Sequence, residues 1–267
     1  MRRVALKIAY LGRDYYGFQR QPGLKTVESE LLSSLEEAGV VSNVDKCGFG
    51  IAGRTDRGVH ALGNVISFLS REGVRINQIN NSLPQSIRIL AQAKVPLQFK
   101  VRYALQRHYR YIWPLLTDDF NFDDMEEAAL YFIGTHDFSN FSKRSERNPV
   151  RTIDKLEIKK GKDQIQIDVF GESFLWNMIR KIVSVLLLVG EGDLNKEKLE
   201  NYFNPNIDLA IRPMPPEGLI LMDVTYPGIN FQEDLYAKNS FYSYLKQEYI
   251  KNQTITLSER DMLKNLM

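Results

Sequence analysis

The first hundred residues alternate between two spacings of apolar positions, one typical of strands and one typical of helices. A helix is expected over 26–39, because Thr26 is a suitable N-cap and Gly39 a suitable end. A shorter helix is expected over 76–83, where Pro84 stops it. Period-two alternation predicts strands over 4–10, 47–52, 61–69 and 87–95. The predicted order is therefore β-α-β-β-α-β.

A comparable order follows from residue 99. The pattern predicts a long strand over 99–113, a helix over 123–132, strands over 154–159 and 164–170, an apolar helix after Ser173, a short helix over 196–203 and a last strand over 217–226. The expected fold is α+β, with two ferredoxin-like halves that share a mainly antiparallel central sheet with flanking helices. The expected units are 1–97, 98–228 and a polar, Tyr-rich extension over 229–267 that is helical in part.

The composition is that of a globular protein, with 43% hydrophobic and 25% charged residues in a chain of 267. The single cysteine, Cys47, cannot form an internal disulfide, and no Cys and His residues have zinc-site spacing. The N-terminus lacks a secretory pattern, and the longest apolar run, 174–190, is interrupted by Arg180 and Lys181. We expect a cytoplasmic protein without a structural metal or a membrane span.

Basic residues are concentrated in the first part of the chain. Residues 1–111 hold 17 Lys or Arg against 8 Asp or Glu, whereas the remainder holds 18 against 25. A second basic stretch runs over 143–162. Such a distribution attracts polyanions, nucleic acid above all, although basic runs are also common on faces that only contact solvent.

Residues 48–53, GFGIAG, match the glycine spacing of a dinucleotide-binding turn, and Glu72 lies about 20 residues further on. In such a site a helix begins within the glycines, so that its N-terminus faces the pyrophosphate. Here RTDRG and then a strand pattern follow. The context therefore argues against a nucleotide site.

Asp56 is a single carboxylate between Arg54 and Arg57, with His60 close by and a turn at Gly58. Cationic neighbours would hold this carboxylate ionised, ready to act as a nucleophile or a base. The alternative is a surface turn in which Thr55 and Asp56 satisfy backbone donors.

Arg180 lies in a segment that is apolar on nearly every side. On a helical wheel it shares a face with Trp176, Val183 and Leu187. A buried guanidinium without a partner is costly, so Arg180 either reaches the surface or meets a carboxylate. Asp56 is a candidate for that carboxylate.

The segment RHYRYIW alternates aromatic and basic residues along a predicted strand. An aromatic row on a strand is usually part of the core, but it also serves as a platform on which a base stacks while nearby arginines hold phosphates. One face carries Tyr109, Tyr111 and Trp113, and the other carries His108, Arg110 and Ile112.

These segments together resemble the tRNA pseudouridine synthase A family. GRTDRGVHALGNVISF is similar to the segment around that family's catalytic aspartate, YLGRDYYGFQRQPG to its N-terminal strand and loop, and FKVRYALQRHYRYIW to its aromatic strand. GTHDFSNFSK, ESFLWNMIRKIV and PPEGLILMDVTYP also match in order, so the resemblance spans about 3–227. Asn64 stands where many members have Gln, and the tail beyond Pro227 has no counterpart in this resemblance.

The resemblance implies a pseudouridine synthase fold and the isomerisation of uridine in the anticodon stem-loop of tRNA, around positions 38 to 40, without metal or organic cofactor. It also implies a homodimer with tRNA lying across both subunits. The rival interpretations are a non-catalytic tRNA-binding or chaperone protein and a nucleoside hydrolase.

The resemblance also gives roles to individual residues. Asp56 would begin glycosidic cleavage, Tyr109 would stack on the flipped uracil and help to remove its C5 proton, and Arg180 would pair with Asp56. Arg54 would fill the vacated space or bind phosphate. Further candidates for substrate contact are Arg57, His60, Arg107 and Arg110.

Overall fold

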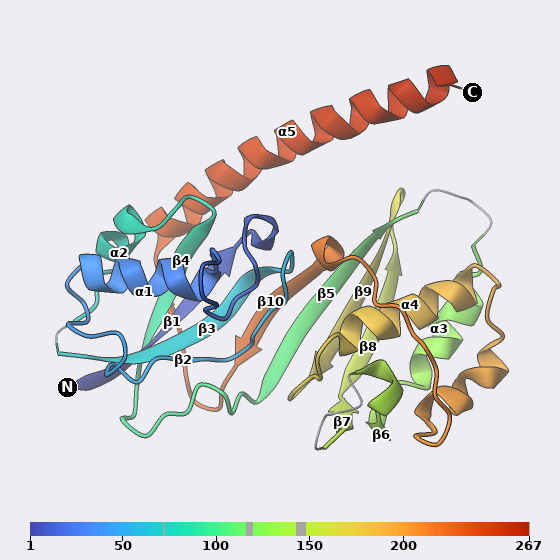
Figure 1. The fold of residues 1–267 in the computed structure, drawn as a ribbon, viewed down its shortest axis with the longest axis horizontal. Coiled ribbons are helices and arrows are strands. Elements are labelled where there is room, and N and C mark those ends of the chain that lie inside the picture. Colours follow the sequence, from blue (N-terminus) through green and yellow to red (C-terminus); the bar gives the residue numbers. More distant parts are fainter. Residues whose placement is uncertain (72, 116–119, 143–147, 267) are drawn as a thin grey trace.

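The computed structural model describes residues 1–71, 73–115, 120–142 and 148–266. In this part of the chain a nine-stranded sheet runs through the whole molecule in the order β11-β4-β1-β3-β10-β5-β9-β8, with β2 paired to β3 (Figure 1). Its strands are β1 (Arg2–Tyr10), β2 (Gly50–Ile51), β3 (His60–Ser70), β4 (Ile87–Val95), β5 (Gln106–Pro114), β8 (Lys155–Lys160), β9 (Gln164–Gly171), β10 (Leu219–Thr225) and β11 (Gln232–Glu233). A separate small sheet pairs β6 (Gly134–Asp137) with β7 (Val150–Ile153).

The large sheet consists of two similar halves that meet at β3 and β10. The first half has the spatial order β4-β1-β3-β2 and the second the order β10-β5-β9-β8, which is the same arrangement twice. The pairs within each half are antiparallel. The halves join through a short parallel contact that aligns Ile220 with His60 and Leu221 with Ala61. The predicted α+β fold with a shared, mainly antiparallel sheet is confirmed.

Helices cover one face of each half. In Figure 1, α1 (Val27–Glu37) and α2 (Ile76–Ser82) lie with the first half, and α3 (Phe122–Leu130) and α4 (Met178–Gly190) with the second. Thr26 caps α1 as predicted: its hydroxyl accepts a hydrogen bond from the Ser29 amide at 3.2 Å. Leu31 and Leu35 of α1 are buried in the common core. No helix in the described ranges is long and apolar enough to cross a membrane.

Two predicted strands are clearly shorter in the structure. The strand expected over 99–113 begins only at Gln106, because turns closed by hydrogen bonds from Phe99 to Pro96 and from Tyr103 to Lys100 precede it. The strand expected over 47–52 is reduced to Gly50–Ile51. Of the basic stretch 143–162, residues 143–147 lie outside the described residues, as does Glu72.

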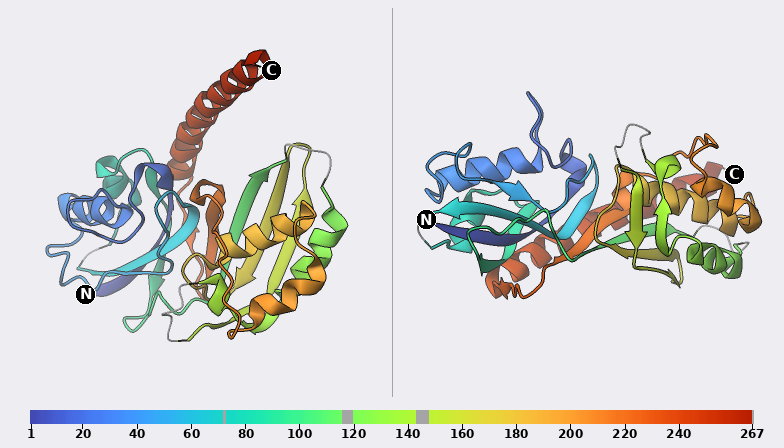
Figure 2. Two further views of the ribbon diagram at one scale, coloured as in Figure 1. Left: turned by 45° about the vertical axis from the view of Figure 1, so that its right-hand side comes forward. Right: turned by 90° about the horizontal axis from the view of Figure 1, so that it is seen from below.

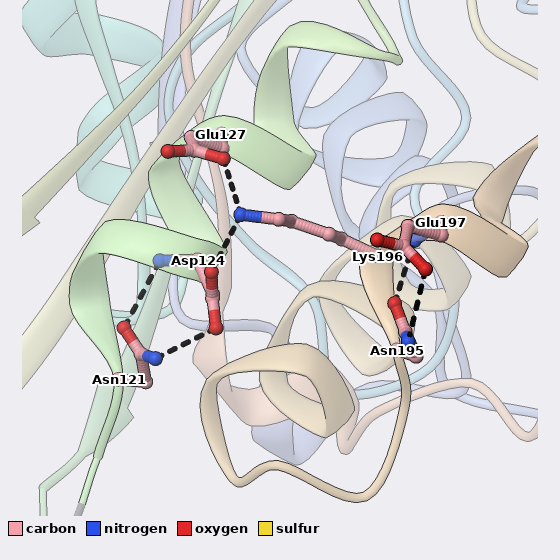
Figure 3. A network of polar contacts seen from close by, with 6 residues as sticks. All are labelled: Asn121, Asp124, Glu127, Asn195, Lys196 and Glu197. Carbon is pink, nitrogen blue, oxygen red and sulfur yellow. Dashed lines mark hydrogen bonds and ion pairs between the residues drawn. The ribbon is translucent and has the colours of Figure 1, made fainter.

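A polar network joins α3 to the short helix η3 (Lys196–Phe203), as Figure 3 shows. The Lys196 ammonium lies 2.7 Å from an Asp124 carboxylate oxygen and also pairs with Glu127. Asn121 caps α3 by accepting from the Asp124 amide at 3.0 Å, and Asn195 caps η3 by accepting from the Glu197 amide at 2.9 Å. The network fixes the outer layer of the second half.

The C-terminal extension forms one 32-residue helix, α5 (Leu235–Leu266), which is more helix than the pattern predicts. Its first turns pack on the first half, where Phe241 contacts Ala9 and Leu90. Glu248 forms an ion pair with Arg13. Residues 251–266 are exposed throughout, and Figures 1 and 2 show this end of α5 extending away from the body of the protein.

Candidate active site

A cleft of about 1210 Å³ opens where the two halves of the sheet meet. The first half contributes the loop 49–59, which contains Asp56, and part of the N-terminal loop. The second half contributes Tyr109 from β5, the segment 173–177 and the first turn of α4. Residues more than a hundred positions apart in the chain therefore face one another across one cavity.

Buried polar side chains hold the loop that carries Asp56. The Asn64 side chain accepts a hydrogen bond from the Gly53 amide at 3.2 Å and donates to the Gly53 carbonyl at 2.8 Å. It also donates to the Tyr10 hydroxyl at 3.1 Å, and that hydroxyl lies 2.8 Å from the Thr55 hydroxyl. Asn64 is fully buried, so these bonds are made away from water. Asn64 therefore supports the loop of Asp56.

Two glycines in this loop allow close approach of other segments. A Cβ at Gly58 would lie 2.8 Å from Pro216, and its φ of +87° is in the region that favours glycine. A Cβ at Gly53 would lie 3.1 Å from Leu221 and 3.3 Å from the Tyr109 hydroxyl. The loop can therefore pack directly against β5 and β10.

The carboxylate of Asp56 has two partners from the second half. The Trp176 indole Nε1 donates a hydrogen bond to Oδ1 at 2.9 Å, and Arg180 Nη1 lies 3.6 Å from Oδ2. The Asp56 side chain is 30% exposed, so it is neither in open water nor fully enclosed. Both of its oxygens thus face donors that arrive from the other side of the cleft.

Burial raises the pKa of Asp56 above its ordinary value, although the hydrogen bond from Trp176 and the charge of Arg180 act to lower it. The cation that acts on the Asp56 carboxylate is Arg180 from the second half of the sheet rather than a neighbour in sequence. Arg57 instead stacks on the Tyr16 ring, 4.4 Å from its centroid. The loss of hydration outweighs the favourable charge, and Asp56 is a stronger base than an ordinary aspartate.

The predicted contact of Arg180 with Asp56 is confirmed by their 3.6 Å separation. Arg180 also donates from Nε to the Met214 carbonyl at 2.5 Å and from Nη1 to Asn177 Oδ1 at 2.9 Å. Its side chain is 13% exposed. Trp176, which a continuous helix would place on the same face, instead precedes α4 and was not recognised from the sequence as a partner of Asp56.

The aromatic strand is divided between the core and the cleft. Tyr111 is completely buried and donates its hydroxyl to the Pro215 carbonyl at 2.8 Å, which is a structural role. Tyr109 lines the cleft and packs edge-on against Phe174, with 5.4 Å between ring centroids. Burial raises the pKa of Tyr109 to about 12, so its phenol is protonated at neutral pH.

Arg107 lines the cleft, but its guanidinium is occupied by backbone carbonyls. It donates to Ala52 at 2.7 Å, to Arg102 at 2.9 Å and to Glu172. The side chain therefore ties the loop of Asp56 to two other walls of the cleft, and few of its donors are open to a phosphate.

Two predicted substrate contacts lie away from the cleft. Arg110 points to the opposite face of the sheet, where Nε is 2.8 Å from the buried carboxylate of Asp168. This follows from strand alternation, because the neighbouring Tyr109 and Tyr111 face the cleft side. His60 accepts a hydrogen bond from the Gly12 amide at 3.0 Å, and burial lowers its pKa. The structure gives both residues partners within the protein.

The basic lining of the cleft includes Arg102, which the sequence did not single out, and Arg151 from the predicted basic stretch 143–162. They join Arg54 and Arg57 there. Arg151 donates from Nη1 to the Asn148 carbonyl at 2.8 Å, whereas its buried Nε has no hydrogen-bond partner among the residues that the structure describes. Within the described ranges, no three His, Cys, Asp or Glu side chains are grouped so that they could hold a metal ion. The cleft thus presents the Asp56 carboxylate, paired with Arg180, among several arginines.

A carboxylate paired with an arginine in an arginine-lined cleft, on two ferredoxin-like halves, is the arrangement expected of the pseudouridine synthase class. A family model described as tRNA pseudouridine synthase matches residues 128–227. Proteins named tRNA pseudouridine synthase A from Methanothermobacter thermautotrophicus and Methanosphaera stadtmanae are 49% and 42% identical over 100% of this chain and 97% and 99% of their own length. The chain belongs to the tRNA pseudouridine synthase A family.

These alignments include the C-terminal extension, because they cover the whole chain. The tail beyond Pro227, for which the resemblance gave no counterpart, is therefore matched in these two relatives. A solved structure described as an archaeal box H/ACA sRNP Nop10-Cbf5 complex is also similar, with a TM-score of 0.35 and 15% identity over 69% of this chain and 43% of that one.

Proposed function

We propose that this protein converts uridine to pseudouridine in tRNA and that Asp56 is its catalytic residue. The observation that carries the proposal is the setting of Asp56. Its carboxylate lies between Trp176 and Arg180 in a cleft large enough for a nucleotide, and its pKa is raised by burial. A carboxylate in this setting suits attack or proton abstraction at a base that enters the cleft.

The reaction is an isomerisation and needs no external oxidant, reductant or group donor. The C1′–N1 bond of the uridine breaks with the help of Asp56, the uracil rotates, and a C1′–C5 bond forms. The proton on C5 is released to solvent, and N1 gains a proton, so atoms and charge balance. The Asp56 carboxylate is regenerated at the end of each turnover.

The target uridine must leave its stack before this bond is accessible, and extrusion costs a few kcal/mol. We propose that Tyr109 offsets part of this cost by stacking on the extruded uracil, because its ring lines the cleft beside Phe174. A phenol with a pKa of about 12 is a poor base at neutral pH, which favours this role over removal of the C5 proton. Arg54 lines the cleft and is the candidate to fill the space that the base vacates or to bind the phosphate of the extruded nucleotide.

We propose that the substrate is the anticodon stem-loop, around positions 38 to 40, and that a homodimer in the cytoplasm binds one tRNA across both subunits. Residues 1–111 have more basic than acidic side chains, and this excess supports the binding of an extended anionic ligand. We also propose the units 1–97 and 98–228 as the two walls of the cleft, with 229–267 as an extension. Analytical ultracentrifugation with and without tRNA measures the stoichiometry.

Release of tritium from tRNA labelled at uridine C5 tests the activity, because the label leaves only if C5 loses its proton. We expect release with the native chain and none with Asp56→Asn, while both bind tRNA with similar affinity. Asp154→Asn is the matched control, because Asp154 is not in the cleft lining. Tritium release by Asp56→Asn at the native rate would overturn the assignment.

A further inference from the structure

Trp176 combines two properties that are seldom found together in one side chain. Its indole Nε1 donates to Asp56 Oδ1 at 2.9 Å, yet 53% of the residue is exposed. An aromatic residue that contributes mainly to the core would be buried. The position of Trp176 in the cleft lining is therefore better explained by its hydrogen bond to Asp56 than by a role in the core.

The backbone next to Trp176 has an unusual conformation that places the indole in the cleft. Asn177 has a φ of 62°, which asparagine tolerates better than most residues. Because of this turn α4 begins at Met178, and Trp176 remains outside the helix. The Asn177 side chain accepts from Arg180 Nη1 at 2.9 Å, so Arg180 is bonded to the residue that follows Trp176 in the chain.

We infer that Trp176 is a positioning residue for Asp56: its indole N–H holds Oδ1, so that Oδ2 is presented to the substrate beside Arg180. This inference rests on the proposed catalytic role of Asp56. The two partners act differently. Arg180 supplies positive charge at 3.6 Å, whereas Trp176 supplies a directional bond to one oxygen without adding charge. A carboxylate held by both has one orientation rather than several.

The pKa of Asp56 gives a readout of this bond. Burial raises that pKa, and the hydrogen bond from Trp176 is the first of the effects that lower it. Loss of the indole N–H would leave burial opposed by Arg180 alone, and the pKa would rise further. The other charged or titratable groups around the carboxylate are Tyr109 on β5, Glu217 in η4 (Pro216–Gly218), which approaches Gly58, and Arg54 and Arg57 on the same loop.

Two substitutions separate the N–H group from the ring. Trp176→Phe keeps an aromatic ring and removes the donor. Trp176→Gln removes the ring and keeps a neutral donor, because its amide nitrogen is four bonds from Cα, as is indole Nε1. Trp113→Phe is the matched control, since Trp113 is the other tryptophan and is not in the cleft lining.

The experiment measures single-turnover tritium release from C5-labelled tRNA as a function of pH, together with tRNA affinity and thermal unfolding. We expect the acid limb of the rate profile to move to higher pH in Trp176→Phe, with a rate about ten-fold below the native rate at the acid end. Trp176→Gln and Trp113→Phe should keep the native acid limb. A loss of packing alone would lower stability without moving the limb.

The outcomes distinguish this inference from the proposed function. A native acid limb in Trp176→Phe, with Asp56→Asn inactive, would overturn the inference and leave the catalytic assignment in place. An active Asp56→Asn would overturn the assignment itself. If Trp176→Phe fails to fold, Trp176→Gln decides, since a shifted limb in that variant would contradict a role for the N–H.

Discussion

Arg180 Nη1 lies 3.6 Å from Asp56 Oδ2, and the two residues belong to opposite halves of the sheet. The pair therefore forms only when the halves are assembled as they are here. Because the Arg180 guanidinium also binds the Met214 carbonyl and Asn177, its position is fixed before any substrate arrives. An oriented charge of this kind loses little free energy to reorganisation during a reaction.

Arg180→Met should lower kcat for tritium release about a hundred-fold, because a fixed charge beside the reacting carboxylate is lost. Arg180→Lys keeps the charge but cannot reproduce the planar set of contacts to Met214 and Asn177, so we expect an intermediate rate. Thermal unfolding of both variants separates lost activity from lost folding. A native kcat in a folded Arg180→Met variant would contradict a role for Arg180 in catalysis.

Asp56→Asn should stabilise the protein at neutral pH while it abolishes activity. Burial raises the pKa of Asp56 in the folded chain, so the folded state binds this proton more tightly than the unfolded state. The stabilising effect of protonation is complete below the unfolded pKa of about 3.9 and is lost as the pH rises through the higher folded value. The ionised carboxylate therefore costs stability at pH 7, and Asn removes that cost.

Urea unfolding of the native chain and Asp56→Asn between pH 8 and pH 4 measures this effect. The gain in free energy of unfolding should be largest at neutral pH and should shrink as the acid range is approached. If Asp56→Asn instead destabilises the protein at pH 7, and the loss of stability grows as the pH rises, the contacts of Asp56 with Trp176 and Arg180 stabilise the folded state more than burial of the carboxylate destabilises it.

Asn64→Ala should impair catalysis because it releases Gly53, three positions before Asp56. The lost bonds to Gly53 and Tyr10 are buried, and we expect a destabilisation of about 2 kcal/mol. Asn80→Ala is the matched control, since Asn80 holds the Ile89 amide and carbonyl at 2.9 and 3.0 Å in the same manner, outside the cleft lining.

Both variants should lose similar stability in urea unfolding, but only Asn64→Ala should lower kcat, by about ten-fold, with little change in KM. Equal kcat in the two variants would mean that the clamp on Gly53 stabilises the fold without orienting Asp56.

Arg54→Gln should weaken tRNA binding and reduce its dependence on salt. Arg54 lines the cleft, and each phosphate contact contributes about 0.7 to 0.9 to the slope of log affinity against log salt. Arg110→Gln should leave that slope unchanged, because Arg110 pairs with Asp168 on the opposite face of the sheet. Filter binding over a salt series measures both slopes, and a reduced slope for Arg110→Gln alone would reverse the assignment of the RNA-binding face.

The sequence by itself determined the elements and most of the chemistry. Periodicity gave the α+β order and the strands of the large sheet except β11, whereas β6, β7 and β11 were not predicted. The cap at Thr26 was identifiable because a helix start is a local pattern. Asp56 and Arg180 were identifiable because each is a charge in a context that does not suit a free charge. Such signals lie within a few residues along the chain, so one sequence is enough to recognise them.

Only the tertiary structure decided which of these groups meet and what surrounds them. The bond from Trp176 to Asp56, the clamp of Asn64 on Gly53 and the backbone contacts of Arg107 join distant segments. Backbone amides and carbonyls are the same at every position, so no sequence pattern marks the ones that a side chain will bind. The raised pKa of Asp56 was likewise decided by burial, because hydration depends on how the two halves close around the carboxylate rather than on its neighbours along the chain.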